Sequence, residues 1–73
     1  MKTVIKVGNY YQGKLSGVIV KALSHEIRNS FQGIVIQNGS SSSMVGEVSD
    51  DWCAESFYEI EHTEQSNHMF PIY

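Results

Sequence analysis

Residues 15–20 read LSGVIV, and residues 31–36 repeat the same pattern as FQGIVI. Each copy has a large apolar residue, a polar residue, a glycine and then three β-branched residues. Valine and isoleucine favour extended backbone because their side chains are stiff at χ1. A short apolar run bounded by Gly, Ser or Asn suits a strand better than a helix. The two copies therefore predict two strands.

Three β-branched residues in succession place apolar side chains on both faces of a strand, because successive side chains alternate. Both faces must then be covered, and a chain of 73 residues does this most economically by curling one sheet into a small barrel. Gly17 and Gly33 lie inside the two predicted strands, where glycine commonly marks a bend or a close backbone approach. We therefore expect the two strands to bend at matching points.

The rest of the chain predicts three further strands and one short turn. The five predicted strands cover residues 3–7, 14–23, 31–37, 44–48 and 57–60. Residues 10–13 are expected to form an aromatic loop or to continue the first strand. Ser49 is a suitable helix N-cap, and Asp50 and Asp51 suit the first turn of a helix, so one helical turn is expected there. On such a turn the two adjacent carboxylates would point in different directions.

Several spaced motifs resemble those of small SH3-like barrel proteins. They are Tyr11-x-Gly13, the two hexapeptides, Gly46-x-x-Ser49-x-x-Trp52 and Phe57-x-x-Ile60. Many compact barrels of this kind come from bacteriophages and mobile elements and have no known function. The resemblance implies an all-β, five-stranded SH3-like barrel with one short helical turn before the last strand. Because fold does not imply function, it leaves the activity open.

The predicted barrel takes up residues 1–61, and residues 62–73 form a polar linker and an apolar C-terminal tail. The apolar tail residues are Met69, Phe70, Ile72 and Tyr73. An apolar chain end promotes association when it is exposed. Three arrangements fit this tail: it folds back on the barrel, it docks on a neighbouring chain and makes a homo-oligomer, or it stays mobile.

Charge is unevenly distributed along the chain. Residues 1–28 carry a net charge of +4 and residues 29–73 carry −7, which gives −3 overall. An acidic half favours a basic partner and disfavours a phosphate backbone. Alternatively, the first and last strands pair with each other. Each facing pair of opposite charges would then stabilise the fold by about 0.2–1 kcal/mol. The residues expected to face each other in that case are Lys2 and Lys6 with Glu59 and Glu61.

Two features of the sequence predict a reduced, cytoplasmic setting. The single cysteine, Cys53, excludes an internal disulfide, and the N-terminal residues lack the apolar region of a signal peptide. In addition, no apolar run approaches the roughly 20 residues that a membrane span needs.

The residues that could carry catalysis or bind a metal are sparse. They are Cys53, His25, His62 and His68. Zinc sites usually contain close pairs such as C-x₂-C or H-x₃-H, and this chain has none. Carboxylates near Cys53 are expected to raise its thiol pKa and to disfavour the thiolate. The sequence therefore predicts no enzyme, no metal site and no cofactor.

Aromatic side chains beside acidic ones form the predicted partner-binding set. Its members are Tyr10, Tyr11, Asp50, Asp51, Trp52 and Tyr58. Aromatic rings flanked by carboxylates suit a basic or arginine-bearing peptide. Two core assignments compete with this one: Trp52 and Phe57 fill the barrel interior, and Tyr10 and Tyr11 divide between core and surface. We expect a small non-enzymatic protein-binding module, in line with phage-type proteins that engage a host protein.

The alternative function is nucleic-acid binding by the basic half of the chain. The residues concerned are Lys2, Lys6, Lys14, Lys21 and Arg28. Stacking platforms for nucleic acid normally combine aromatic side chains with a basic groove. The acidic residues next to Trp52 oppose this function.

Overall fold

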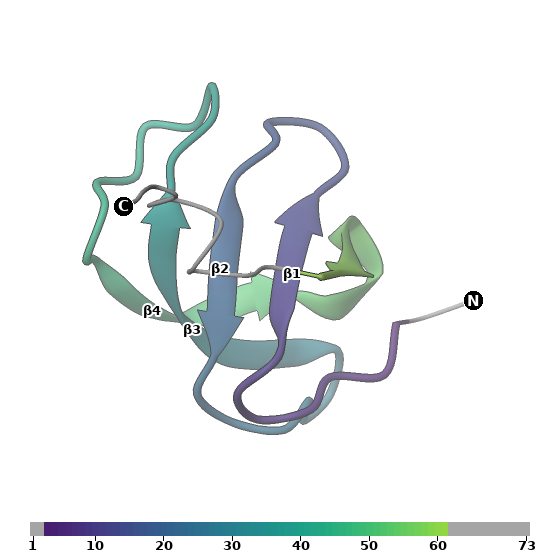
Figure 1. Cartoon of the computed structure of the whole chain (residues 1–73). Coiled ribbons are helices and arrows are strands. Elements are labelled where there is room, and N and C mark those ends of the chain that lie inside the picture. Colours follow the sequence, from purple (N-terminus) through teal and green to yellow (C-terminus); the bar gives the residue numbers. More distant parts are fainter. Residues whose placement is uncertain (1–2, 62–73) are drawn as a thin grey trace, which may run out of the picture.

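The computed structural model describes residues 3–61, which form one antiparallel sheet of five strands. The strands are β1 (Tyr10–Gly13), β2 (Ile19–Ala22), β3 (Ser30–Gln37), β4 (Val48–Cys53) and β5 (Phe57–Ile60). A single 3₁₀ turn, η1 (Ala54–Ser56), precedes β5. The strand order is β4-β3-β2-β1-β5 (Figure 1). The predicted all-β fold, with five strands and a short turn before the last one, is confirmed.

The sheet is curled, because its two outer strands are joined by a very short connection. In a flat sheet β4 and β5 would lie about 19 Å apart, at roughly 4.8 Å for each strand spacing. The chain from Cys53 to Phe57 spans about 14 Å at most. Trp52 of β4 and Phe57 of β5 pack edge to face, with ring centroids 5.7 Å apart. In Figure 1 the β4 ribbon crosses behind β2, as this curl requires.

The two hexapeptides do not form equivalent structures. The second copy lies entirely within β3, whereas the first copy begins in the turn between β1 and β2. Gly17 belongs to that turn and has a φ of +79°, a backbone conformation that suits glycine. Gly33 instead lies within β3, beside an irregularity in the pairing with β4. The expected strand over residues 14–23 was therefore too long, and the prediction of matching bends was wrong.

Residues 3–7 do not form the predicted first strand. The Tyr11 hydroxyl accepts a hydrogen bond from the Lys6 amide at 2.8 Å and donates one to the Val4 carbonyl at 3.1 Å. The Thr3 hydroxyl donates to the Phe57 carbonyl at 2.6 Å. Several polar groups of this segment are therefore satisfied by contacts other than a strand ladder, while Ile5 is buried in the core.

Residues 10–13 form the true first strand, β1, which pairs with both β2 and β5. The first and last strands thus pair as expected, but with different residues facing each other. Tyr11 lies opposite Glu59, and the Asn9 side-chain amide donates to the Glu59 carboxylate at 3.1 Å. The predicted facing of Lys6 and Glu59 is wrong, and Lys2 lies outside the described residues.

The predicted strand over residues 44–48 and the helical turn from Ser49 are also wrong. Residues 45–46 lie in a turn, and Ser49 to Trp52 belong to strand β4. The Ser49 hydroxyl donates to the Asp51 carboxylate, within the strand, and does not cap a helix. The short helical turn comes later, at η1, because pairing with β3 keeps the chain extended as far as Cys53.

The core lies on the inner face of the curled sheet. Its buried residues are Ile5, Tyr11, Val18, Val20, Ala22, Phe31, Val35, Ala54 and Phe57. The Phe31 ring is central, with centroids 5.9 Å from Tyr11 and 5.4 Å from Phe57. Phe57 is thus buried as predicted, and Trp52 packs against the core while staying partly exposed. Tyr11 is buried and Tyr10 is partly exposed, so the expected division of the two tyrosines is confirmed.

Two further predictions concern a membrane span and the apolar C-terminal tail. Within residues 3–61 there is no helix of the length and hydropathy needed to cross a membrane. The tail residues Met69, Phe70, Ile72 and Tyr73 lie outside the described part of the chain.

Candidate partner-binding surface

A β-bulge in strand β4 places two adjacent aspartates opposite a single residue of β3. Phe31 pairs with Trp52, and the next registered pair is Gly33 with Ser49. The single residue Gln32 of β3 therefore faces two residues of β4, Asp50 and Asp51, which is the pattern of a bulge. Both aspartates are exposed, and β4 is an outer strand of the sheet. The bulge thus places two exposed acidic residues at one position of the sheet edge.

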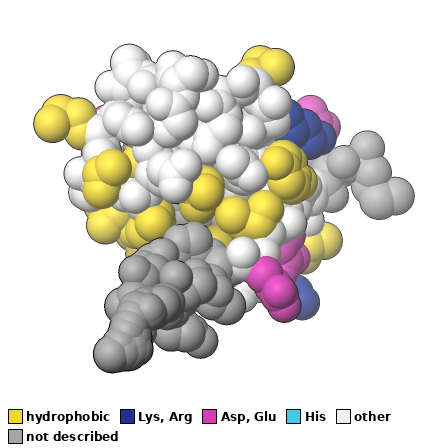
Figure 2. Space-filling view, turned by 45° about the horizontal axis from the view of Figure 1, so that its top comes forward, with side chains coloured by type: hydrophobic (Ala, Val, Ile, Leu, Met, Phe, Trp, Pro, Cys, Tyr) yellow, Lys and Arg dark blue, Asp and Glu magenta, His cyan; other side chains and the backbone are white. Residues whose placement is uncertain are grey.

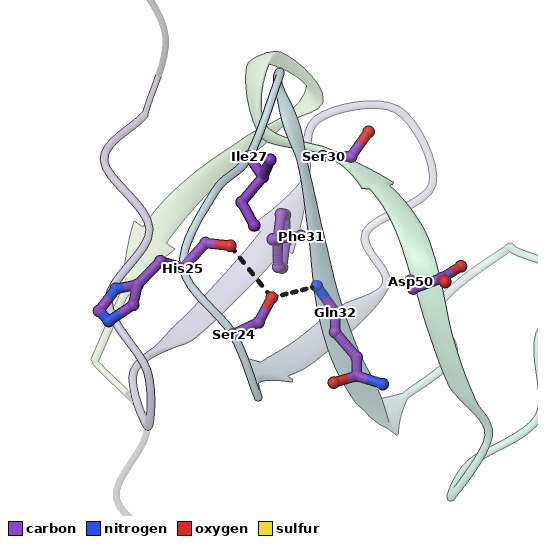
Figure 3. A pocket seen from close by; sticks show the side chains of 7 residues that line it. All are labelled: Ser24, His25, Ile27, Ser30, Phe31, Gln32 and Asp50. Carbon is purple, nitrogen blue, oxygen red and sulfur yellow. Dashed lines mark hydrogen bonds between the residues drawn. The ribbon is translucent and has the colours of Figure 1, made fainter.

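An open hollow of about 290 Å³ lies beside this bulge (Figure 3). Its lining residues are Ser24, His25, Ile27, Ser30, Phe31, Gln32 and Asp50. Figure 3 shows the Phe31 ring between Ile27 and Ser24, with Asp50 on the neighbouring strand. Ile27 is 69% exposed although it is apolar. The hollow therefore combines an apolar part with an acidic residue, Asp50, on the neighbouring strand.

The loop between β2 and β3, which forms one wall of this hollow, is held in place by hydrogen bonds. Ile27 and Ser30 exchange two backbone hydrogen bonds, of 2.7 and 3.0 Å, around a two-residue turn. Both turn residues, Arg28 and Asn29, have positive φ, as in a type I′ hairpin. The Ser24 hydroxyl accepts a hydrogen bond from the Gln32 amide at 2.9 Å (Figure 3). The hairpin backbone and the Ser24 hydroxyl therefore hold this wall in place.

Asn29 connects this loop to the junction between β4 and η1. Its carbonyl accepts from the Ala54 amide at 2.8 Å, and its side-chain oxygen accepts from the Glu55 amide at 3.1 Å. Its side-chain amide donates to the Cys53 sulfur at 3.2 Å. These contacts fix the position of the hairpin relative to the acidic strand.

The thiol of Cys53 is more acidic than the sequence predicts. Hydrogen bonds from the Ser56 side chain and the Glu55 backbone, together with a smaller contribution from Asn29, lower the pKa of Cys53. These donors stabilise the thiolate and outweigh the effect of burial, which acts in the opposite direction. The expectation that nearby carboxylates raise this pKa was therefore wrong, because donors contact the sulfur directly.

The six predicted partner-binding residues are not all exposed. Asp50 and Asp51 lie on β4, whereas Tyr10 and Tyr58 lie on β1 and β5. The Tyr58 hydroxyl donates to the Gln12 side chain at 2.8 Å. Tyr11 is fully buried, so its side chain is not available to a partner.

Trp52 is turned toward the sheet and the core. Its indole N–H donates to the Gly33 carbonyl at 3.1 Å, and its ring packs on the core. The residues missed by the sequence analysis are Ile27, Phe31 and Gln32, which line the hollow. One signal was present, because Ile27 is the only apolar residue in the polar segment 24–30.

The basic residues of the described chain are spread over the molecule. Lys6 precedes β1, Lys14 lies in the turn that follows β1, Lys21 lies within β2, and Arg28 lies in the loop that follows β2. On the face drawn in Figure 2, the basic side chains lie at two separate places, each next to an acidic side chain. This distribution gives no support to a continuous basic groove on that face.

Within residues 3–61, no group of three or more His, Cys, Asp or Glu side chains is placed to hold a metal ion. His62 and His68 lie outside the described residues.

Comparisons of the chain with protein-family models, with curated proteins and with solved structures find no match. The resemblance to small SH3-like barrels of bacteriophages therefore stays a prediction.

Proposed function

We propose that the protein is a non-enzymatic binding module with an SH3-like barrel fold, which holds a basic segment of a partner protein. The strand order β4-β3-β2-β1-β5 and the 3₁₀ turn before β5 support the barrel assignment. So does the short connection that draws β4 toward β5. The proposed binding surface, called the acidic edge below, consists of Ile27, Gln32, Asp50 and Asp51, and the buried Phe31 ring lies beneath it.

The observation that carries this proposal is the bulge beside the hollow. A lysine or arginine side chain has an apolar stem and a charged head, so it suits a site with an apolar wall and a carboxylate rim. Ile27 supplies exposed apolar surface, and Phe31 lines the hollow beneath it. Asp50 and Asp51 supply two carboxylates for charge-assisted hydrogen bonds.

The position of β4 adds a second way to hold a peptide. Among the described strands β4 pairs with β3 alone, so its outer edge presents backbone groups to which an extended peptide can add as a further strand. A second copy of β4 would bring four aspartates together at this edge, and that repulsion disfavours self-pairing. An extended segment with basic side chains can both add to the edge of β4 as a strand and be attracted by the aspartates.

The test is a titration of the ¹⁵N-labelled full chain with a synthetic peptide that alternates arginine and valine. We expect amide shift changes at Ile27, Gln32, Asp50 and Asp51, and an affinity that weakens as salt rises. A peptide with glutamate in place of arginine serves as the control ligand and is expected to leave these amides unchanged.

The matched variants separate the acidic edge from the general negative charge. Asp50→Asn with Asp51→Asn removes two exposed pairs worth about 1–2 kcal/mol in total, so Kd is expected to rise about 5- to 30-fold. Glu55→Gln with Glu61→Gln removes the same charge elsewhere and is expected to change Kd less than about 2-fold. Equal losses for both double variants, or shift changes confined to other strands, would contradict the proposal.

Nucleic-acid binding stays the second candidate, although no observation specifically favours it. A 12-nucleotide oligothymidylate added to the same labelled chain gives the comparison. Tight, salt-dependent binding of the oligonucleotide, with shift changes at Lys14, Lys21 and Arg28, would favour this candidate over the acidic edge.

A further inference from the structure

One residue from each of the five strands lies in a single row across the outer face of the sheet. The registered pairs run from Ile60 to Tyr10, from Tyr10 to Lys21, from Lys21 to Ile34 and from Ile34 to Val48. Directly paired residues project on the same face of a sheet. Tyr11, next to Tyr10, is fully buried, so the row lies on the face opposite the core. We call these five residues the outer row.

The outer row is apolar except at its centre. Val48 is 50% exposed, and the other four residues are partly exposed. The Lys21 ammonium lies 5.9 Å from the centroid of the Tyr10 ring, within cation–π range. The outer face of an antiparallel sheet is normally polar where water covers it. A row of four apolar or aromatic residues on that face therefore indicates a docking surface.

We propose that residues 69–73 of the same chain dock along the outer row. This segment reads MFPIY and has no charged side chain, whereas residues 62–68 are polar. Measured along the curled sheet, the row covers four strand spacings, about 19 Å, and five extended residues span about 17 Å, so the segment is long enough to follow most of the row. The row also starts at Ile60, where the described strands end.

The connection is long enough for this docking. From Glu61 to Met69 the chain advances eight residues, which reach about 27 Å when extended. That reach exceeds the length of the row, so the segment is able to begin at either end of it.

The charge at the centre of the row favours the tail over two other occupants. A second copy placed face to face would bring two Lys21 ammonium groups together, and a basic segment would meet the same repulsion. An uncharged apolar segment covers Ile60, Ile34 and Val48 and leaves the Lys21 head group at the margin, in water. This docking is separate from the acidic edge and does not depend on it.

The test uses a spin label on the full chain. In a Cys53→Ser and Ser66→Cys chain, a nitroxide on residue 66 is expected to broaden the amide signals of Tyr10, Lys21 and Ile34. The broadening is expected to stay constant on tenfold dilution, since both partners belong to one molecule. Adding Phe70→Ser and Ile72→Ser to the labelled chain is expected to remove most of it.

Two further variants and a dilution series decide between the occupants. Ile34→Lys places a second cation in the row and is expected to weaken the broadening, while Leu15→Lys, at a site 97% exposed and outside the row, is expected to leave it unchanged. Broadening that falls on dilution would assign the row to a second copy and overturn the proposal. Broadening at other strands, or none at the row, would also overturn it.

Discussion

At the scale of single residues, one buried hydroxyl decides the structure of the N-terminal segment. The Tyr11 side chain is fully buried, and its hydroxyl bonds to the Lys6 amide and the Val4 carbonyl. Tyr11→Phe leaves both groups without this partner. Val4 and Lys6 are exposed, so water replaces part of the loss, and the expected destabilisation is about 1–2 kcal/mol by urea unfolding.

Hydrogen exchange of the Lys6 amide adds a local readout to this substitution, because the amide is expected to exchange faster in Tyr11→Phe. Tyr58→Phe is the control, since it removes one exposed hydroxyl that bonds to Gln12. Tyr58→Phe is expected to lower the free energy of unfolding by less than about 0.5 kcal/mol. Equal costs for the two variants would show that the Tyr11 hydroxyl does not hold the segment.

The same residue explains why the first strand was predicted in the wrong place. Residues 3–7 read TVIKV, and this β-branched composition favours extended backbone locally. The sequence does not reveal that the Tyr11 hydroxyl, a few residues later in the chain, bonds to two backbone groups of this segment. Burial of Ile5 and Phe57 agrees with their apolar character, so membership of the core was easier to predict than hydrogen bonding.

At the scale of elements, strand β3 packs closely against Trp52 at Gly33. A Cβ atom at Gly33 would lie 3.2 Å from the Trp52 ring and 3.3 Å from the Lys21 carbonyl and the Val20 side chain. Gly33→Ala therefore crowds this site, and the expected cost is about 1–3 kcal/mol in urea. The indole is expected to move outward, so its fluorescence emission should shift to the red.

A double-mutant cycle identifies which neighbour resists the added methyl group. In a Trp52→Leu background the closest contact is removed, while the contacts with Lys21 and Val20 remain. Gly33→Ala is expected to cost less there, with a coupling of about 0.5–1.5 kcal/mol. Costs that add without coupling would show that the strand backbone, and not the indole, sets the requirement for glycine.

Strand prediction from the sequence succeeded where local pattern and tertiary pairing agree. Strands β3 and β5 were predicted closely, because their apolar residues fit a half-buried pleat. Strand β4 was missed because its sequence, VSDDWC, has a polar centre that suits a helix start when read alone. Pairing with β3 overrides that preference, and the resulting bulge at Asp50 and Asp51 has no sequence signal of its own.

At the scale of the whole molecule, burial and long-range pairing explain why the candidate site differs from the predicted one. The predicted residues were grouped by chemistry, and the fold buries Tyr11 completely and packs Trp52 on the core. Within the described residues, the acidic edge depends instead on the hairpin at Ile27, which lies more than twenty residues away from Asp50 in the chain. Such a long-range juxtaposition depends on strand register, which the sequence did not fix.

The core described above lies within residues 3–61, and this leads to the last prediction. A chain ending at Glu61 retains all five strands, η1 and the nine buried core residues, so it is expected to fold and to unfold cooperatively in urea. It is also expected to bind the arginine-valine peptide with the Kd of the full chain, because the acidic edge is intact.

If residues 69–73 cover the outer row, the shortened chain should be less stable by about 1–3 kcal/mol and should bind more of an apolar dye. Equal stability and equal dye binding would argue against tail docking and leave the acidic edge untouched, whereas an unfolded fragment would show that the fold itself requires residues 62–73.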